Sequence, residues 1–468
     1  MADINLFGGL YTGTANDSSV TAAQALPWIP IGSDSGGTGY TGTFDGNGYT
    51  ITMMYARGTE KLGLFGTLGS GANVKSVVLA DNRLEATDNT AGARYAGGIA
   101  GYVKGDNASI TGCRNAGRLE LPEAGSYFGG TAGYITGTGN KVTSCENAGT
   151  ITGTGDYLGG IIGGIESGSG IVIDGCHNNE SGTVSNGGKR NTGGILGGAI
   201  SGNTTVRNSY NRGTADGGAT GTNAGGIAGS VTAETSVAGC YNAGPVTGAG
   251  AGGTVRSITG VNPGSGNITF CYYAAGSSYP AASYPADRDA TGVEGAAFGC
   301  WGAAFALNGE KLGQTTGISW TYQTGDDYPS YGTLKRAANW EQVGESIEYG
   351  LIKDKEKPLG DGDVDPYEIT TPEQLAWFAY QVNEKAQNGI CGMLMNDIDM
   401  KAAESRYIAE GGGRLNWIPI GRMDDSYEGP DYQGVFTSRN EPGSGNPRNI
   451  CQIRNLYVNN KLFGGLFG

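Results

Sequence analysis

A repeat of about thirty-one residues constrains this chain more than any other feature of its sequence. Between residues 95 and 276 an apolar Gly-Gly segment, a polar turn, a Cys-x-Asn-x-Gly segment and a second polar turn recur about six times. Internal repeats of roughly 20 to 50 residues indicate solenoids, propellers or arrays, so this spacing decides the fold class first. The repeated small residues, at intervals of 32, 31, 33, 31 and 31, are Cys113, Cys145, Cys176, Ser209, Cys240 and Cys271.

Two further markers advance together with the cysteines, so the register of the repeat is held at three positions. One marker is an asparagine two residues after the cysteine, and the other is a glycine pair upstream of it. The asparagines are Asn115, Asn147, Asn178, Asn211 and Asn242. The glycine pairs are Gly97-Gly98, Gly129-Gly130, Gly159-Gly160, Gly193-Gly194, Gly225-Gly226 and, less regularly spaced, Gly252-Gly253.

The composition excludes a helical solenoid. The chain has 89 glycines among its 468 residues, and each glycine inside a helix costs roughly 1 kcal/mol relative to alanine. The remaining solution is an all-β parallel solenoid, in which each repeat forms one coil of two or three short strands and coils stack at about 4.8 Å. Short alternating runs such as 74–79, 150–152 and 171–173 suit such strands. We expect the glycines at bends, where positive φ is needed and a Cβ would clash.

Stacking converts each repeated position into a ladder along the solenoid axis. We expect the cysteine position to point inward as a column of small buried groups, with Ser209 fitting the same slot. We expect the asparagines to lie in a turn and to hydrogen-bond their copies above and below, at about 1 kcal/mol net per bond. Isoleucines after the glycine pairs should fill the core; they are Ile99, Ile161, Ile195 and Ile227.

The net charge limits the partners. Acidic residues exceed basic ones by 44 to 30, which gives a charge of −14 and a pI near 4.6. Nucleic acid and anionic membranes are disfavoured because both need clustered Lys and Arg. We find no apolar run of the roughly 20 residues that span a bilayer, and no signal peptide at the start of the sequence.

The cysteines predict a buried thiol ladder and no metal or cofactor site. Five of the eight are copies of one repeat position, and Cys300, Cys391 and Cys451 are isolated in sequence. The chain has no C-x-x-C motif and a single histidine, so a zinc site is not expected. That histidine, His177, occupies a variable slot and is expected on the surface.

Phrases from the start of the chain return near its end, which predicts two modules. Residues 395–400 echo residues 1–6, and Trp-Ile-Pro-Ile-Gly at 417–421 echoes 28–32. Gly-Leu-Phe-Gly at 465–468 likewise echoes 63–66. We predict a β-helix module at 1–290 lacking its N-terminal cap, a C-terminal cap region at 291–336, a linker at 337–366 and the start of a second β-helix module at 367–468.

Two helices are expected outside the repeats. Residues 294–308 carry apolar side chains at helical spacing and should cover the open end of the solenoid, with a strand at 320–322. Thr371-Pro372-Glu373 is a helix start, so residues 372–384 should form the N-terminal cap of the second module.

The first module begins at the position equivalent to residue 395 and has no such helix. We expect either an excerpt from a longer array, which we favour, or a carboxyl end that supplies the cap to the next molecule. The second alternative makes the chain a self-assembling fibre subunit with head-to-tail association.

The Gly-Leu-Phe-Gly phrase, the Trp-Ile-Pro-Ile-Gly and Phe-Asp-Gly-Asn-Gly openings and the Gly-Gly-Ile-x-Gly coils resemble the GLUG-motif repeats of bacterial surface proteins. That family includes putative adhesins and the stalk regions of immunoglobulin-A protease-like proteins. The resemblance covers nearly all of residues 1–276 and 361–468. It implies a right-handed parallel β-helix and an extracellular, secreted or cell-surface location, and it transfers no catalytic residue.

The most favoured function is therefore a non-catalytic adhesin or stalk module that binds a glycan or a surface protein along a lateral face. Exposed tyrosines could stack on sugars or could pack between turns; examples are Tyr127, Tyr157 and Tyr210. The alternative is a polysaccharide lyase or glycosidase, which needs two or more acids and a base in one groove. Its candidates, in turns at unrelated phases of the repeat, are Asp156, Asp174, Asp216, Lys189 and Arg190.

Two weaker functional patterns are also present. Asp361, Asp363 and Asp365 have the spacing of a calcium-loop start but lack the glycine and glutamate that should follow, so a linker is favoured. Thr-Gly-Thr phrases at 12–14, 41–43, 136–138 and 220–222 could suggest an ice-binding face. Their offsets within the coil vary, which argues against a flat threonine array.

Overall fold

The structure is a computed structural model in which the chain forms two compact units, residues 1–292 and 293–468. The residues that it describes are 2–6, 27–32, 38–58, 60–86, 94–121, 126–187, 190–218, 223–248, 254–261, 267–275, 290–312, 319–408, 413–421, 431–439, 450–459 and 465–468. Glycine pair 252–253, Lys189 and the Thr-Gly-Thr phrases at 12–14 and 220–222 lie outside these ranges.

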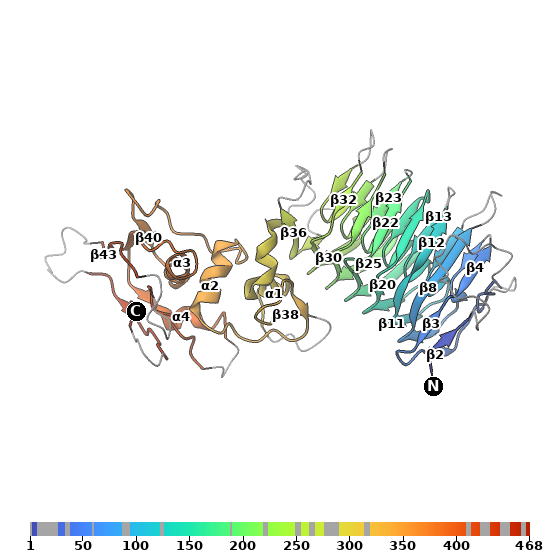
Figure 1. Ribbon diagram of the computed structural model, residues 1–468, viewed down its shortest axis with the longest axis horizontal. Coiled ribbons are helices and arrows are strands. Elements are labelled where there is room, and N and C mark those ends of the chain that lie inside the picture. The colour runs from blue at the N-terminus through green and yellow to red at the C-terminus, as the bar shows by residue number, and fades with distance from the viewer. Residues whose placement is uncertain are drawn as a thin grey trace. The chain divides into compact units, whose positions relative to one another are not determined.

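The first unit is a solenoid of parallel strands, which confirms the predicted parallel β-helix (Figure 1). Within the described residues its strands form four sheets, here named A to D, and the assigned strand pairs within them run parallel. Sheet A consists of β1 (Ile4–Asn5), β3 (Thr50–Thr52), β4 (Tyr55–Gly58), β8 (Val78–Ala86), β12 (Arg114–Leu121), β16 (Glu146–Asn147), β17 (Thr150–Gly153), β21 (His177–Asn178), β22 (Thr183–Asn186), β26 (Tyr210–Asn211), β27 (Thr214–Asp216), β31 (Tyr241–Asn242), β32 (Val246–Thr247), β36 (Cys271–Ala275) and β37 (Ala290–Glu294).

The other three sheets take one strand from most coils. Sheet B consists of β6 (Phe65–Leu68), β10 (Ala100–Val103), β14 (Ala132–Ile135), β19 (Ile162–Ile165), β24 (Leu196–Ala199), β29 (Ala228–Ser230) and β34 (Thr259–Val261). Sheet C consists of β2 (Thr43–Asp45), β7 (Asn73–Lys75), β11 (Ser109–Thr111), β15 (Lys141–Thr143), β20 (Gly168–Asp174), β25 (Gly202–Arg207), β30 (Thr235–Ala238) and β35 (Ile268–Thr269). Sheet D consists of β5 (Lys61–Leu62), β9 (Arg94–Gly97), β13 (Ser126–Gly129), β18 (Tyr157–Gly159), β23 (Asn191–Gly193), β28 (Asn223–Gly225) and β33 (Val255–Arg256).

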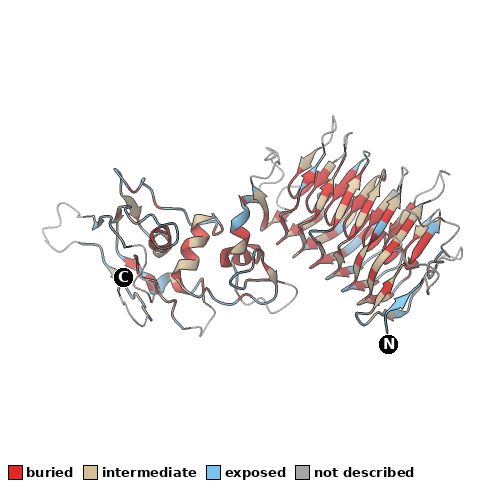
Figure 2. Cartoon of the chain, in the orientation of Figure 1, coloured by how far each residue is buried: buried red, intermediate tan, exposed pale blue. Residues whose placement is uncertain are grey.

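Each coil passes through sheets C, A, D and B in turn, so the prediction of two or three strands per coil is wrong. The coil from β15 to β19, for example, has five short strands. The error arises because glycine and asparagine turns break each repeat more often than its apolar runs indicate. Figure 2 colours the buried residues red. Beside a small cluster of Ala215, Ala224 and Val246, the inward apolar side chains form one large core. The predicted core isoleucines, Ile99, Ile161, Ile195 and Ile227, all lie in it with no exposed surface.

The glycine pairs confirm one of the two reasons predicted for glycine, the lack of space for a Cβ, but not the other, a positive φ. No glycine of the five described pairs has positive φ. A Cβ on Gly130 would lie 2.3 Å from the carbonyl oxygen of Gly160 in the next coil and 2.6 Å from Oδ1 of Asn147. The pair is therefore glycine because the backbone and the repeat asparagine of the next coil leave no space for a side chain, which explains why the two markers advance together.

Positive φ is found instead at the residue just before the cysteine position. This residue ends the strand of sheet C and turns the chain into sheet A. Glycine takes this turn in three coils, and serine, asparagine or phenylalanine takes it in the others. The residues are Gly112, Ser144, Gly175, Asn208, Gly239 and Phe270, with φ between 47° and 63°.

The second unit combines helices with short strands. Its elements are the 3₁₀ helix η2 (Gly295–Gly299), α1 (Trp301–Leu307), β38 (Trp320–Thr321), β39 (Ser330–Tyr331), α2 (Trp340–Glu348), β40 (Tyr367–Ile369), α3 (Pro372–Asn383), β41 (Gly392–Leu394), β42 (Ile398–Asp399), α4 (Met400–Glu404), β43 (Phe436–Ser438) and β44 (Ile453–Arg454). Strands β40, β41 and β43 pair in parallel, as do β42 and β44.

Both predicted helices are present. Helix α3 begins as its sequence indicates, with the Thr371 side chain accepting a hydrogen bond from the backbone N–H of Gln374 and Pro372 in the first turn. The predicted helix at 294–308 is divided into η2 and α1, and the strand predicted at 320–322 is β38. The use of α1 as a cap for the solenoid stays a prediction.

The linker predicted at 337–366 is wrong for much of its length. It contains helix α2, whose Asn339 cap accepts a hydrogen bond from Gln342 and whose Trp340, Val343 and Ile347 are buried. The prediction of a linker rested on the charged run at 353–357, which follows this helix. The cap region, the linker and the second module predicted separately thus belong to one compact unit.

Candidate functional site

The asparagines of the repeat form a buried ladder inside the solenoid. Each Nδ2 donates to Oδ1 of the asparagine in the next coil. The four distances from Asn115 through Asn147, Asn178 and Asn211 to Asn242 are 3.1, 2.8, 2.8 and 2.7 Å. The described asparagines are the second residues of short strands in sheet A rather than turn residues, which corrects that part of our prediction. This ladder has no access to solvent and cannot contact a ligand.

The cysteines of the repeat form a second inward column. All five are buried and free, and Ser209 takes the sixth place, where its Oγ accepts from the backbone N–H of Cys176 at 3.2 Å. The pKa of Cys113 is raised, mainly by its contact with the thiol of Cys145 and by burial. The pKa of Cys240 is raised by burial and by Cys271. The raised pKa keeps these two thiols protonated, and burial of all five places the column in the core as a structural feature.

Tyrosines gather on one lateral face of the solenoid, over sheets D and B. Tyr95, Tyr127 and Tyr157 are register partners on β9, β13 and β18. Tyr102 and Tyr134 are register partners on β10 and β14. We name these five residues the tyrosine surface. Four of them are partly exposed, whereas Tyr134 lies buried among them.

The rings of the tyrosine surface hold one another in place. Tyr95 and Tyr134 stack at 4.6 Å with 7° between their planes, and Tyr127 and Tyr157 stack at 5.1 Å with 6°. Tyr127 and Tyr134 join the two stacked pairs at 4.5 Å. Because each ring is fixed by its neighbours, little side-chain entropy is left to be lost when a ligand binds.

Glycines in the next coils make space for this aromatic cluster. The register that carries Tyr102 and Tyr134 continues with Gly164 and Gly198. A Cβ on Gly164 would lie 2.3 Å from the Tyr127 ring, and one on Gly198 would lie 2.6 Å from another tyrosine ring, that of Tyr157. The rings of Tyr127 and Tyr157 therefore lean onto the following coil at positions where a side chain would collide with them.

Polar groups surround the hydroxyls of the tyrosine surface. Tyr134 donates to the carboxylate of Glu166, and Tyr102 shares a hydrogen bond of 3.0 Å with Thr136. Arg190 forms an ion pair with Asp156 at 3.4 Å, next to Tyr157. The surface thus offers apolar ring area together with donors and acceptors at its edge.

Four residues of the tyrosine surface have a raised pKa and therefore stay neutral at physiological pH. Burial, followed by the negative charge of Glu166, raises the pKa of Tyr127 to about 12. Burial also raises the pKa of Tyr95, of Tyr134 and of Tyr157, although the positive charge of Arg190 acts against it at Tyr157. Neutral phenols can both donate and accept hydrogen bonds.

The structure separates Tyr210 from Tyr127 and Tyr157, the two tyrosines named with it from the sequence. It lies on β26 of sheet A, stacked between His177 at 4.7 Å and Tyr241 at 4.9 Å. His177 is half-buried rather than fully at the surface, and this burial lowers its pKa. Sequence analysis found part of the tyrosine surface and missed Tyr95, Tyr102 and Tyr134, which a search for tyrosines at the repeat period could have found.

The acidic candidates for catalysis each have their own local partners. Asp174, at the end of β20 in sheet C, pairs with Arg207 at 2.7 Å. Asp216, at the end of β27 in sheet A, accepts from Ser185 and Thr247. The structure thus joins only Asp156 and Arg190 from this set; Lys189 lies outside the described residues.

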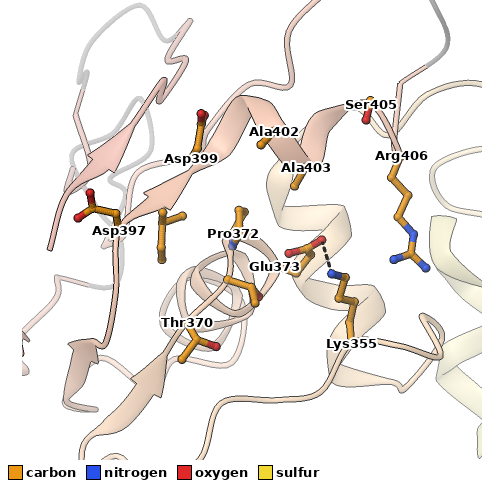
Figure 3. Close-up of a pocket in the computed structure, with 12 residues that line it drawn as sticks. Lys355, Thr370, Pro372, Glu373, Asp397, Asp399, Ala402, Ala403, Ser405 and Arg406 are labelled. Carbon is orange, nitrogen blue, oxygen red and sulfur yellow. Dashed lines mark ion pairs between the residues drawn. The ribbon is translucent and has the colours of Figure 1, made fainter.

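A shallow pocket of about 420 Å³ lies in the second unit, between α3, α4 and β42 (Figure 3). Glu373, Asp397 and Asp399 line it together with Lys355 and Arg406. Three acids and two bases in one pocket is the arrangement that an enzyme would need.

These charges are already paired within the protein. Lys355 contacts Glu373 at 3.3 Å, and Tyr407 also donates to Glu373 at 3.0 Å. Asp397 pairs with Arg454 at 2.6 Å. Arg406 contacts Asp354 at 2.6 Å and also binds Glu310, so its charge is compensated. A hydrogen bond from Asn455 lowers the pKa of Asp399, which keeps it ionised at neutral pH.

Metal and membrane features are missing from the described part of the chain. It holds no group of three or more His, Cys, Asp or Glu side chains placed to bind a metal ion. Asp361 instead accepts two backbone hydrogen bonds, from Asp363 and Asp365, both at 2.9 Å, and these lower its pKa. No helix in the described ranges has the length and apolar character that crossing a bilayer requires.

Comparisons with protein-family models, curated proteins and solved structures give no match to this chain.

Proposed function

We propose that this chain is a non-catalytic binding module of a secreted or cell-surface protein and that its tyrosine surface binds a glycan. The observation that carries the proposal is the cluster of five tyrosines on a lateral face, joined by stacked and tilted ring contacts. Tyrosine combines apolar ring area with a hydroxyl, which suits a ligand that presents both C–H groups and hydroxyls. The resemblance to GLUG-motif adhesins supports the same function and the extracellular location.

Charge favours a neutral glycan over an acidic one. The carboxylate of Glu166 lies at the edge of the tyrosine surface, and the whole chain carries a net charge of −14, whereas Asp156 is paired with Arg190. A sulfated or uronic-acid polymer would meet like charges there, which costs binding free energy. A neutral oligosaccharide would instead gain hydrogen bonds from the phenols and from Glu166.

The test is an array of neutral and acidic oligosaccharides probed with the full chain. We expect binding to neutral glycans and a loss of at least tenfold in affinity for Tyr127→Ala. Tyr127→Phe, which keeps the ring but removes the hydroxyl, should lose less.

Tyr210→Ala is the matched control, since it removes a stacked outer tyrosine from a different sheet. It should leave the affinity unchanged. Binding that is unaffected by both Tyr127 variants, or binding restricted to acidic glycans, contradicts the proposal.

The pocket of the second unit is the observation that favours the alternative, a carbohydrate-active enzyme. A general acid or base there would have to leave its ion pair, because Glu373 is held by Lys355 and Tyr407. Release of reducing sugars from the same neutral glycans measures this alternative. Activity that is present in the unmodified chain and lost in Glu373→Gln would replace the non-catalytic assignment.

A further inference from the structure

The Trp-Ile-Pro-Ile-Gly and Gly-Leu-Phe-Gly segments make equivalent hydrogen bonds in the first coil of the solenoid and in the second unit. The indole N–H of Trp28 donates to the carbonyl oxygen of Leu64 at 3.1 Å, and that of Trp417 donates to Leu466 at 3.2 Å. The backbone N–H groups three residues later bind the same two carbonyls at 3.0 and 2.9 Å. The segments that repeat in sequence therefore also have equivalent structures.

Aromatic side chains extend this correspondence. In each unit a phenylalanine of the Gly-Leu-Phe-Gly phrase is contacted by one tyrosine and one further phenylalanine, with ring centroids 5.0 to 5.5 Å from it. The three residues are Tyr40, Phe44 and Phe65 in the first unit and Tyr432, Phe436 and Phe467 in the second.

Equivalent positions differ sharply in exposure. Ile4 and Leu6 in the first unit are 51% and 39% exposed, whereas their counterparts Ile398 and Met400 are 1% and 0% exposed. Ile29 is 78% exposed. Trp28 is half-buried where Trp417 is fully buried. The first unit thus presents apolar side chains that the second unit covers.

Helix α3 packs against the corresponding segments of the second unit. Asn383 at its end donates to the carbonyl oxygen of Pro419 at 3.1 Å and accepts from the N–H of Gly421 at 2.9 Å. Phe378 contacts the rings of Phe436 and Tyr432, with centroids 5.5 and 5.9 Å apart. A single helix therefore binds both the Trp-Ile-Pro-Ile-Gly segment and the aromatic group.

We propose that the opening coil of the first unit, formed by Ile4, Leu6, Trp28, Ile29 and Phe44, is a docking surface for an amphipathic helix of the α3 type. The partner has an apolar face with an aromatic residue placed as Phe378 is, and an asparagine placed as Asn383 is. The α3 of this chain already lies in its own unit, so the partner is a separate segment. The docking does not depend on the proposed function.

The experiment uses the full chain with residues 361–394 fused ahead of residue 1, because residue 395 corresponds to residue 1. Hydrogen exchange followed by mass spectrometry reports on the amides of residues 2–6 and 27–32. We expect exchange there to slow at least tenfold in the fused protein. Exchange in the central coils should stay the same, which shows that the solenoid is folded.

A second fusion carries the equivalents of Phe378→Asp and Asn383→Ala in the grafted helix only. Its opening coil should exchange as fast as that of the unfused chain. Equal exchange in the two fusions overturns the proposal. Protection of the opening coil that appears in the unfused chain and increases with its concentration also overturns it, because the partner would then be a second copy.

Discussion

The solenoid and the second unit satisfy their buried polar groups in opposite ways. The centre of the solenoid uses a column of neutral amides, each bonded to the next. The second unit uses carboxylates: Glu348 accepts from Trp377 at 2.6 Å, and Glu373 is held by Tyr407 and Lys355. A stacked repeat can bond each side chain to its own copy, whereas helices that meet once need unlike partners. Only the second arrangement responds to pH.

Interrupting the amide column should have the largest effect. Asn178→Ala removes the bonds to Asn147, Asn211 and Gly182 and leaves buried amide groups unpaired. We expect a loss of about 3 kcal/mol in the free energy of unfolding. Urea denaturation followed by circular dichroism measures it.

The end of the column provides the control for this change. Asn242→Ala affects one ladder bond and the bond to Gly244, so its cost should be smaller. Equal costs for the two variants would mean that the column has no cooperative role.

Removing a buried carboxylate from the second unit should rank next. Glu373→Ala leaves the Tyr407 hydroxyl and Lys355 without their partner. We expect a loss of about 2 kcal/mol, read from tryptophan fluorescence, because five of the six tryptophans lie in residues 293–468. The exposed residue Glu356 serves as control, and Glu356→Ala should change the stability very little. A cost for Glu373→Ala above that of Asn178→Ala would reverse the ranking.

The pH dependence of the second unit should come partly from Glu345. Burial raises its pKa from 4.5 to about 7, with the charges of Glu341 and Glu384 acting in the same direction. The folded state therefore favours the protonated acid, and this contribution to stability is complete below pH 4.5 and is lost as the pH rises to about 7.

Glu345→Gln should remove this part of the pH dependence of the stability of the second unit. Because the Glu345 side chain is partly exposed, solvent weakens the effect, and the gain at pH 8 should be about 1 kcal/mol. Thermal unfolding at pH 5 and pH 8 measures it, and an unchanged pH slope in the variant would assign the titration to another group.

The smallest effect is expected in the thiol column. Ser209 already occupies one place there and donates to the carbonyl oxygen of Arg207 at 2.8 Å. Cys176→Ser can reach the carbonyl of Val142, which the thiol contacts at 3.4 Å. We expect a change below about 1 kcal/mol. A larger loss would show that the column requires sulfur and is as selective as the amide ladder.

The repeat period by itself determined the parallel solenoid, the columns of Cys113 and Asn115 with their copies, and the inward isoleucines. Each follows from one geometric fact: residues one period apart lie on top of one another in stacked coils. The start of α3 was also readable, because Thr371-Pro372-Glu373 is a local signal.

Only the tertiary structure decided the positions that depend on contacts between coils or between helices. The reason for each glycine pair is the carbonyl of the next coil, and the tyrosine surface forms because Gly164 and Gly198 leave space for rings from the preceding coil. Helix α2, by contrast, carried a local signal, the Asn339 cap with apolar residues at 340, 343 and 347, but the charged run beside it led to the prediction of a linker. The repeat period determines which residues lie in the same column along the solenoid. The sizes of the side chains in neighbouring columns determine which of these residues are in contact.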